Sequence, residues 1–464
     1  MTYELNVYTG SLAVASVITL LLTIKARAGT GTKAPFSAEF KRFQLLFLVT
    51  YYASMTADWL QGPYVYALYS SYGFSKHDIA VLFVGGFGAS MVFGTFIGAA
   101  ADKMGRKRLC QVYCILYILS CVTKHARHYW ILMLGRILGG IATSLLFSSF
   151  ESWMVCEHNA RGFDSASLSD TFSLMYFGNS LCAILAGMMA EAAADFQTLT
   201  RYSGVWHYGG YCSPFDLSMC FLVIGFALIT SNWRENYGNT DATSGCGDLS
   251  HPIAQMRTDT AILQAGAVIS FFEGSMYIFV FNWTPAISAG SKESPPFGLI
   301  FAAFMVACMG GSSLFAILSE KLSAEKILTY VFLASAAALA IPLFTSTTLM
   351  SLTSFLLFEA CVGMYWPSIG TVKSMVVPEE TRATIYNIYR VPLNAIVLAV
   401  LLNHISTTTA LSCCSAMLFV AFLTQRNLVE RMAAMAAAVK MVPSDEESGG
   451  NAKKGLMSGD DRDY

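Results

Sequence analysis

The sequence predicts an all-α membrane protein with two six-helix bundles and one extra N-terminal transmembrane helix. Its 464 residues are 55% hydrophobic and only 13% charged, whereas a soluble domain carries about 25% charged residues. Apolar segments long enough to cross about 30 Å of hydrocarbon recur along the chain. A polar stretch at residues 232–257 separates these segments into two groups.

Thirteen apolar segments can be drawn at a rise of about 1.5 Å per residue. They cover residues 5–24, 43–69, 79–101, 109–123, 129–152, 168–193, 214–231, 259–285, 297–318, 327–345, 350–372, 383–403 and 410–425. The first has Glu4 before it and Lys25 and Arg27 after it, which is the reverse of a cleaved signal peptide. We therefore expect it to be retained as an extra helix.

These segments divide the chain into five parts, as secondary transporters with two related halves are divided. We expect an extra helix with a basic loop over 1–41, an N-terminal six-helix bundle over 42–231, a cytoplasmic central loop over 232–257, a C-terminal six-helix bundle over 258–425 and a cytoplasmic disordered tail over 426–464. The tail is expected to be disordered because it is polar and cannot bury a core.

The loop between the segments 79–101 and 109–123 carries the most specific motif. It reads Gly98-Ala99-Ala100-Ala101-Asp102-Lys103-Met104-Gly105-Arg106-Lys107-Arg108. Gly98 lets two helices approach closely, and Asp102 can cap a helix or pair with a base. Gly105 permits a tight turn, and Arg106 can anchor at lipid headgroups.

The basic residues orient the chain if this loop is cytoplasmic. Five of them then fall in outer loops (Lys76, Lys124, Arg127, Arg201 and Lys292) and two within spans (Arg136 and Arg390), which leaves 22 of the 29 on the inner side. This bias follows the positive-inside rule. It predicts an N-terminus outside and a C-terminus in the cytoplasm.

Five ionisable side chains lie within predicted spans, where a charge is costly and marks a functional candidate. They are Asp58, Arg136, Glu273, Glu359 and Arg390. Asp58 could neutralise Arg136, and Glu273 or Glu359 could neutralise Arg390. Three acids still face two bases, so at least one acid is protonated, hydrated or bound to a cation. We expect Glu273 or Glu359 to carry a coupled proton, because desolvation favours the protonated carboxyl.

The two arginines are the predicted anion ligands, since a guanidinium offers a planar and always charged donor fork. Asn387 and Asn394 share a helix face with Arg390, and Tyr51 shares a polar face with Asp58. We expect the substrate site to be lined by Arg136, Arg390, Tyr51, Asp58, Asn387 and Asn394.

Several stretches together resemble one transporter family. They are Ala57-Asp58-Trp59-Leu60-Gln61, Gly135-Arg136-Ile137-Leu138-Gly139-Gly140, Leu146-Phe147-Ser148-Ser149-Phe150-Glu151-Ser152-Trp153, Asn232-Trp233-Arg234-Glu235-Asn236-Tyr237, Ile278-Phe279-Val280-Phe281-Asn282-Trp283-Thr284-Pro285 and Arg390-Val391-Pro392-Leu393. The chain resembles the eukaryotic molybdate-anion transporter family of the major facilitator superfamily, and the Gly98–Arg108 loop resembles that superfamily's signature loop.

The resemblance implies the major facilitator fold, a cell-membrane location and import of molybdate by alternating access. It also implies that Gly98, Asp102, Gly105 and Arg106 act in gating. Bringing a dianion into a cell at about −100 mV costs roughly 4.6 kcal/mol, so we hypothesise proton coupling. Another anion such as sulfate or an organic anion, or a non-transporting sensor or scaffold, remains an alternative.

Other classes of protein are disfavoured. The chain has no nucleophile elbow, metal-ligand cluster or phosphate-binding glycine loop, so we expect no enzyme, no cofactor and no metal site. A net charge of −1 gives no attraction to nucleic acid. The expected partners are a tetrahedral oxyanion and the lipid bilayer, and we expect the chain to act as a monomer.

Overall fold

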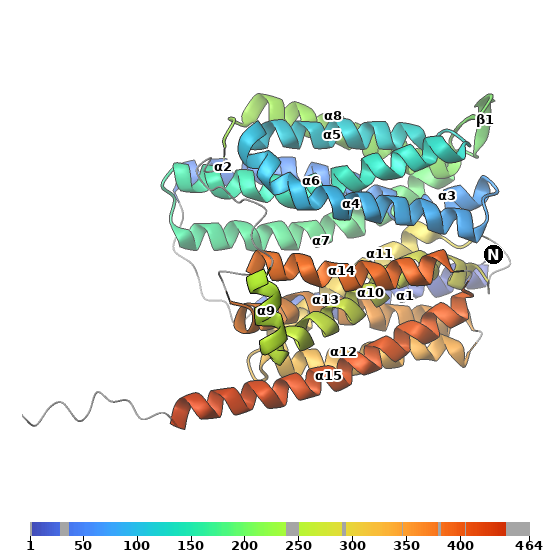
Figure 1. The fold of residues 1–464 in the computed structure, drawn as a ribbon. Helices are drawn as coiled ribbons and strands as arrows, with labels where there is room; N and C mark the ends of the chain where they lie inside the picture. The colour runs from blue at the N-terminus through green and yellow to red at the C-terminus, as the bar shows by residue number, and fades with distance from the viewer. Residues whose placement is uncertain are drawn as a thin grey trace, which may run out of the picture.

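The computed structural model describes residues 2–27, 37–237, 250–289, 294–345, 347–378, 382–403 and 405–441. Within these ranges the backbone is almost entirely helical and forms two bundles that lie side by side (Figure 1). Ten of the described helices are long and apolar enough to cross a membrane. The predicted all-α fold of two six-helix bundles with an extra N-terminal helix is confirmed.

The N-terminal bundle comprises α2 (Ala38–Gln61), α3 (Val65–Ser71), α4 (Lys76–Met104), α5 (Arg106–Thr123), α6 (Tyr129–Ala160), α7 (Ser165–Phe196) and α8 (Ser213–Asn232). The C-terminal bundle comprises α10 (Thr260–Ser288), α11 (Phe297–Leu318), α12 (Ala324–Ala340), the short η2 (Ile341–Leu343), α13 (Thr348–Val376), α14 (Arg382–Leu402) and α15 (Thr407–Met441). The short helix α9 (Ser250–Thr258) precedes the second bundle, and α1 (Thr2–Arg27) precedes the first.

The two ends of the bundles are distinct. One end carries a small antiparallel hairpin of β1 (Thr200–Ser203) and β2 (Trp206–Tyr208), followed by the short η1 (Gly210–Cys212). We call it the hairpin end. The other carries the turn between α4 and α5, and we call it the signature-loop end. Figure 1 places α9 and the end of α15 toward the signature-loop end.

The expected span 43–69 is not a single helix. It divides into α2 and α3 at Gly62 and Pro63. Proline has no amide hydrogen to continue the helical ladder and clashes with the preceding turn, so the break follows from the sequence. α3 turns the chain at the hairpin end before α4 begins.

One other expectation needs correction. The last helix continues to Met441, so the predicted boundary at residue 425 falls inside α15. Residues 426–441 are rich in alanine and methionine, which favour helix and extend it beyond the membrane-length segment. The segment 194–213, for which the sequence indicated no element, contains the hairpin. The rest of the predicted tail and the loop at 379–381 lie outside the described residues.

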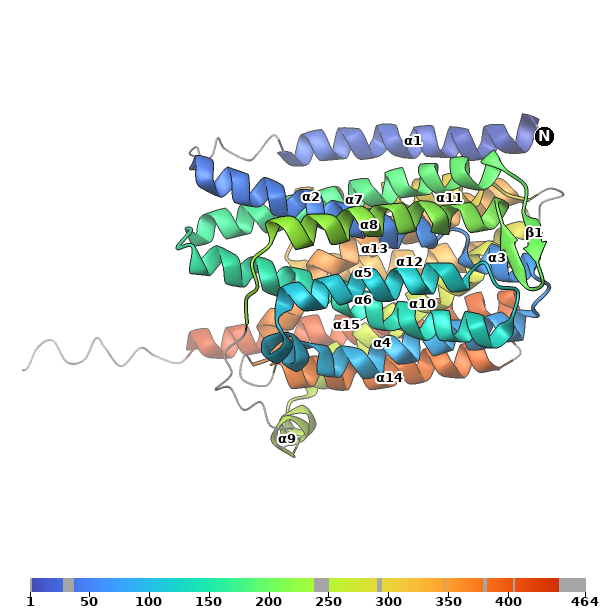
Figure 2. The same ribbon diagram turned by 90° about the horizontal axis from the view of Figure 1, so that it is seen from above.

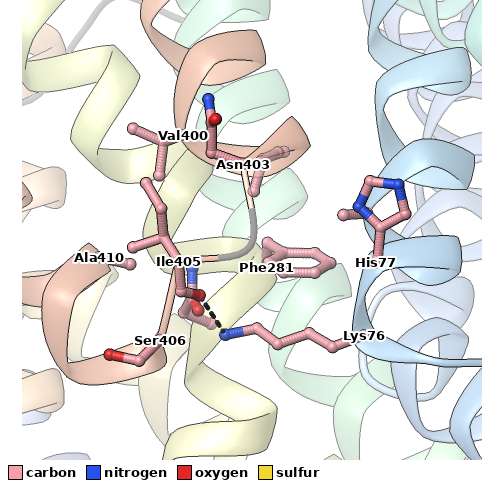
Figure 3. A pocket seen from close by; sticks show the side chains of 11 residues that line it. Lys76, His77, Phe281, Val400, Asn403, Ile405, Ser406 and Ala410 are labelled. Atoms are coloured by element: carbon pink, nitrogen blue, oxygen red, sulfur yellow. Dashed lines mark hydrogen bonds between the residues drawn. The ribbon is translucent and has the colours of Figure 1, made fainter.

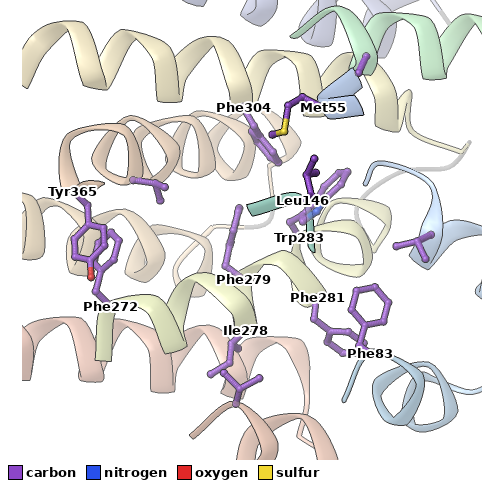
Figure 4. Packing of buried hydrophobic residues seen from close by; sticks show 14 of the residues in the cluster. Met55, Phe83, Leu146, Phe272, Ile278, Phe279, Phe281, Trp283, Phe304 and Tyr365 are labelled. Atoms are coloured by element: carbon purple, nitrogen blue, oxygen red, sulfur yellow. The ribbon is translucent and has the colours of Figure 1, made fainter. Parts of the chain in front are cut away.

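The bundles contact each other closely at the hairpin end. A Cβ placed on Gly298 of α11 would lie 2.4 Å from the carbonyl oxygen of Gly187 of α7, so the two backbones touch there. Aromatic and aliphatic side chains from both bundles fill the space nearby, including Phe83 and Phe281, whose ring centroids are 5.4 Å apart (Figure 4). This packing brings α4 of the first bundle next to α10 of the second.

The extra helix α1 packs along α11 at one side of the molecule (Figure 2). Thr19 donates a hydrogen bond to the carbonyl of Val306 at 2.9 Å, and the hydroxyls of Thr23 and Ser313 lie 3.0 Å apart. α1 is therefore joined to the C-terminal bundle by polar contacts as well as by apolar packing, which suits association in a membrane.

Candidate substrate site

Arg390 lies where the two bundles meet. It comes from α14 and helps line a cavity of about 40 Å³, together with Ser90 of α4, Tyr277 of α10 and Asn394 one turn further along α14. A Cβ on Gly94 of α4 would lie 3.9 Å from Nη1 of Arg390. The guanidinium is exposed, and no hydrogen bond or ion pair to it is found among the described residues. It therefore keeps donors available for an anion.

Glu273 and its partners lie beside Arg390. Tyr365 of α13 donates a hydrogen bond to Oε1 of Glu273 at 2.9 Å. The charges of Lys373 and Arg390 both act on this carboxyl, although neither forms an ion pair within 4 Å of it. The C-terminal bundle thus gathers a carboxyl, a tyrosine and two cations around one polar region.

Arg136 occupies a different place. Its Nε donates to the carbonyl of Leu82 at 3.2 Å, and its guanidinium lies 4.4 Å from the centroid of the Phe83 ring. A Cβ on Gly86 would lie 2.8 Å from its Nη2, so a larger residue there would displace the guanidinium. Gly86 and Gly94 are eight residues apart on α4, which is about 12 Å along the helix. Arg136 and Arg390 therefore contact α4 at separate levels.

Asp58 does not pair with Arg136. Its carboxylate accepts a short hydrogen bond from Tyr117 of α5, and no ion pair of Asp58 occurs among the described residues. Tyr51 is buried, with its ring 5.8 Å from that of Phe47. Both side chains lie inside the N-terminal bundle, away from the Arg390 cavity. The predicted set is therefore not gathered into one site in this conformation.

Glu359 is buried between helices of the C-terminal bundle. It is only 6% exposed, and its charge acts on Cys308 of α11. No hydrogen bond or ion pair of its carboxyl occurs within the described ranges. Arg390 is not among the groups that act on Glu359. Of the two acids predicted to carry a proton, Glu273 is the one that faces the Arg390 region.

The turn at the signature-loop end has a defined partner. Gly105 has a φ of +98°, and a Cβ there would lie 2.6 Å from the carboxyl carbon of Glu235. Glu235 accepts hydrogen bonds from the backbone nitrogens of Lys107 at 2.8 Å and Arg108 at 3.2 Å. A carboxylate at the first turn of α5 is stabilised by the free amides there.

Arg106 also binds within the N-terminal bundle. Its Nη1 donates to the carbonyl oxygen of Ser152 at 3.3 Å. Its backbone nitrogen donates to the carbonyl oxygen of Asn236 at 3.0 Å. Trp153 and Trp233 stack with ring centroids 3.8 Å apart beside this junction. The segment 232–237 therefore holds the turn in place. The surroundings of Gly98 and the side chains of Asp102 and Asn387 lie outside what the structure describes.

The hairpin end is closed by hydrogen bonds between the bundles. Lys76 of α4 donates to the carbonyl of Ile405 at 3.3 Å (Figure 3). It also donates to the hydroxyl of Thr407 at 3.0 Å. These contacts border a pocket of about 270 Å³ that also includes Phe281 and Asn403. The contact crosses from α4 to the turn before α15, so it joins the two halves of the molecule.

A second closure involves Glu191 near the end of α7. Its Oε2 accepts hydrogen bonds from the backbone nitrogens of Gly298 at 2.6 Å and Leu299 at 3.3 Å, and from the hydroxyl of Tyr64 at 2.7 Å. Pro296 precedes α11 and has no side-chain acceptor for its first amides. Glu191 therefore supplies the cap of α11 from the opposite bundle.

Sequence reasoning missed Glu191, Glu235 and the contacts of Lys76. Glu235 lies in the stretch 232–237 that carried the family resemblance. The resemblance drew attention to this position but did not indicate that its carboxylate caps α5. Glu191 and Lys76 gave no local signal, because their partners are more than 100 residues away along the chain.

Comparisons with known proteins identify the family of this chain. Residues 3–361 match a family model described as "Sugar-tranasporters, 12 TM". The molybdate-anion transporter of Xenopus tropicalis is 35% identical over 379 residues, covering 80% of each chain, and that of Xenopus laevis is 33% identical, covering 86% of this chain and 88% of the relative. This chain belongs to the molybdate-anion transporter family of the major facilitator superfamily.

Solved structures support the fold. The nucleoside transporter NupG aligns with a TM-score of 0.62 and 11% identity, covering 85% of this chain and 99% of its own. A D-xylose-proton symporter aligns with a TM-score of 0.63 and 13% identity, covering 84% and 97%. The relatives and structural neighbours are transporters rather than enzymes, and this family member is a multi-pass membrane protein of the same fold.

Proposed function

We propose that this protein imports molybdate, a tetrahedral oxyanion, and that Arg390 is its principal anion ligand. The observation that supports this most directly is a guanidinium without a described partner at the junction of the two bundles. Tyr277, Ser90 and Asn394 line the same cavity and offer neutral polar groups. Charge-assisted bonds from a guanidinium to an oxyanion are the stronger class of hydrogen bond. The relatives' names supply the choice of molybdate.

The position of the cavity supports a mechanism in which the bundles move. Its lining comes from α4 of the first bundle and from α10 and α14 of the second. An anion bound there would therefore be released when α4 and α14 separate. Relative rocking of two repeats around a central site is how such folds give alternating access.

We also propose that the hairpin end faces outward and the signature-loop end faces the cytoplasm of a cell that carries the protein in its surface membrane. The distribution of lysine and arginine supports this orientation. The bonds of Lys76 and Glu191 between the bundles then close the outer side. Gly105 and Arg106, with Gly98 and Asp102, would act at the inner gate.

Glu273 is the group we propose for proton coupling. Entry of a dianion against about −100 mV costs roughly 4.6 kcal/mol, so a co-transported cation is needed for accumulation. The carboxyl of Glu273 is hydrogen-bonded to Tyr365 and lies in the field of Arg390. An anion bound to Arg390 would offset that positive field, so anion binding and protonation of Glu273 would favour each other.

Uptake by purified protein in liposomes tests this function. Labelled molybdate should enter protein-containing vesicles faster than empty ones, and an inwardly directed proton gradient should accelerate entry. Unlabelled sulfate, which is also a tetrahedral dianion, measures selectivity when added as a competitor. Absence of uptake under every gradient would contradict transport and favour a sensor or scaffold.

A further inference from the structure

Lys124 is a buried cation that the proposed site does not use. It follows the last residue of α5 and is only 2% exposed. Its backbone carbonyl accepts a hydrogen bond from Tyr72 at 2.8 Å. Its amino group makes no hydrogen bond or ion pair with any residue that the structure describes. Lysine is almost never buried in this way unless it is paired, and an unpaired buried charge is costly.

Two further donors lie around the Lys124 amino group. Its Nζ lies 5.6 Å from the centroid of the Tyr69 ring. The Tyr69 hydroxyl is fully buried and has no hydrogen-bond partner within the described part of the chain. Arg136 of α6 is the third group, because its charge acts on both Lys124 and Tyr69. Its Nε donates to the carbonyl of Leu82. No acceptor for its two terminal nitrogens is found among the described residues.

The acids of this region are engaged elsewhere. Asp58 accepts a hydrogen bond from Tyr117, and Asp216 forms an ion pair of 2.9 Å with His125. The titratable groups that face Lys124 are Tyr69 from α3, Cys121 from α5 and Arg136 from α6, with Tyr72 and Cys212 at its backbone carbonyl. This set contains no carboxylate. Lys124 and Tyr69 therefore carry buried donors without an acceptor in the described part of the chain, and the positive charge of Arg136 acts on both.

We propose that Lys124, Arg136 and Tyr69 form a second binding site for the same class of small inorganic oxyanion, near the hairpin end of the N-terminal bundle. The proposal rests on the proposed transport function. It assigns Arg136 and Arg390 to two successive anion sites instead of one. Arg136 contacts α4 at Gly86 and Arg390 contacts it near Gly94, about 12 Å further along the helix. An anion from the outer side would meet the Lys124 site first and the Arg390 site second.

The second site is sensitive to pH. Burial, together with the nearby charge of Arg136, lowers the pKa of Lys124 to about 7. The amino group is therefore charged below about pH 7 and neutral above it. A bound anion favours the charged form, so binding above pH 7 takes up a proton and weakens as the pH rises.

Equilibrium binding of labelled molybdate to the purified full-length protein tests the proposal. The wild type should bind two ions per chain at pH 6, and one of them should bind about tenfold more weakly at pH 8. Lys124→Met should bind one ion at both pH values, and Lys124→Arg should bind two at both, because arginine stays charged. Lys326→Met removes an exposed lysine from α12 and serves as the matched control, with wild-type binding expected.

The result separates this site from the transport site. Two ions bound to Lys124→Met at pH 6 would overturn the second site while leaving the Arg390 site intact. Displacement by chloride but not by sulfate would overturn its assignment to oxyanions. Binding of no molybdate by the wild type would instead contradict the proposed function. If Lys124→Met does not fold, Tyr69→Phe gives the same test, with weaker binding at one of the two sites expected.

Discussion

Replacing Glu191 with glutamine should loosen the closed hairpin end. The carboxylate accepts two bonds from the backbone of α11 across the boundary between the bundles, at 2.6 and 3.3 Å. Hydrogen bonds to a charged group contribute about 1.5–3 kcal/mol, against about 0.5–1.5 kcal/mol for neutral groups. Losing the charge therefore costs the closed form about 1 kcal/mol per bond, or about 2 kcal/mol in total. This corresponds to a factor of about 30 in the ratio of closed to open forms.

A distance measurement across the hairpin end checks this value. Spin labels at Ser203 of the first bundle and Thr347 of the second would report separation of the bundles in a background without reactive native cysteines. Glu191→Gln should increase the population of the longer distance by up to about thirtyfold. Glu320→Gln, at an exposed position on the opposite end, is the control and should leave the distribution unchanged. An unchanged distribution in Glu191→Gln would refute the idea that this carboxylate holds the bundles together.

Three further substitutions have defined outcomes. Gly105→Ala should lower the melting temperature, because a non-glycine residue at a φ of +98° costs about 1–2 kcal/mol and its Cβ would clash with Glu235, which caps α5. An unchanged melting temperature would contradict the role of Gly105 in this turn. Gly86→Ala should displace Arg136 and slow molybdate uptake, whereas Gly88→Ala, whose Cβ meets nothing within 4 Å, should not. Equal rates in these two variants would show that the position of the guanidinium is unimportant. Glu273→Gln should permit uptake driven by the anion gradient but abolish its stimulation by a proton gradient, and retained stimulation would exclude Glu273 as the coupled group.

The sequence predicted the features that depend on local pattern. The number of long apolar segments, the two halves and the extra first helix follow from hydropathy and from the central polar stretch. Arg390 and Asn394 share one face of α14 because they are four residues apart, and both line the same cavity. The break at Pro63 and the continuation of α15 to Met441 were not predicted, although a proline and a run of helix-forming residues mark them in the sequence.

Features that depend on distant contacts could not be predicted from one sequence. Asp58 was expected near Arg136, but the packing of α2 against α5 brings Tyr117 to it instead. In the sequence, Lys124 looks like an ordinary loop lysine after an apolar segment. Its burial depends on helices that are distant along the chain. The hairpin at 200–208 did carry a signal, since aromatic and β-branched residues flank Gly204.

The central claim is that Arg390 binds the transported oxyanion. Initial rates of labelled molybdate uptake into proteoliposomes test it most directly when Arg390→Gln is compared with Arg201→Gln, an exposed arginine on β1. At equal amounts of folded, reconstituted protein, the first variant should lose at least tenfold in rate and the second should match the wild type. Wild-type uptake by Arg390→Gln would contradict the account.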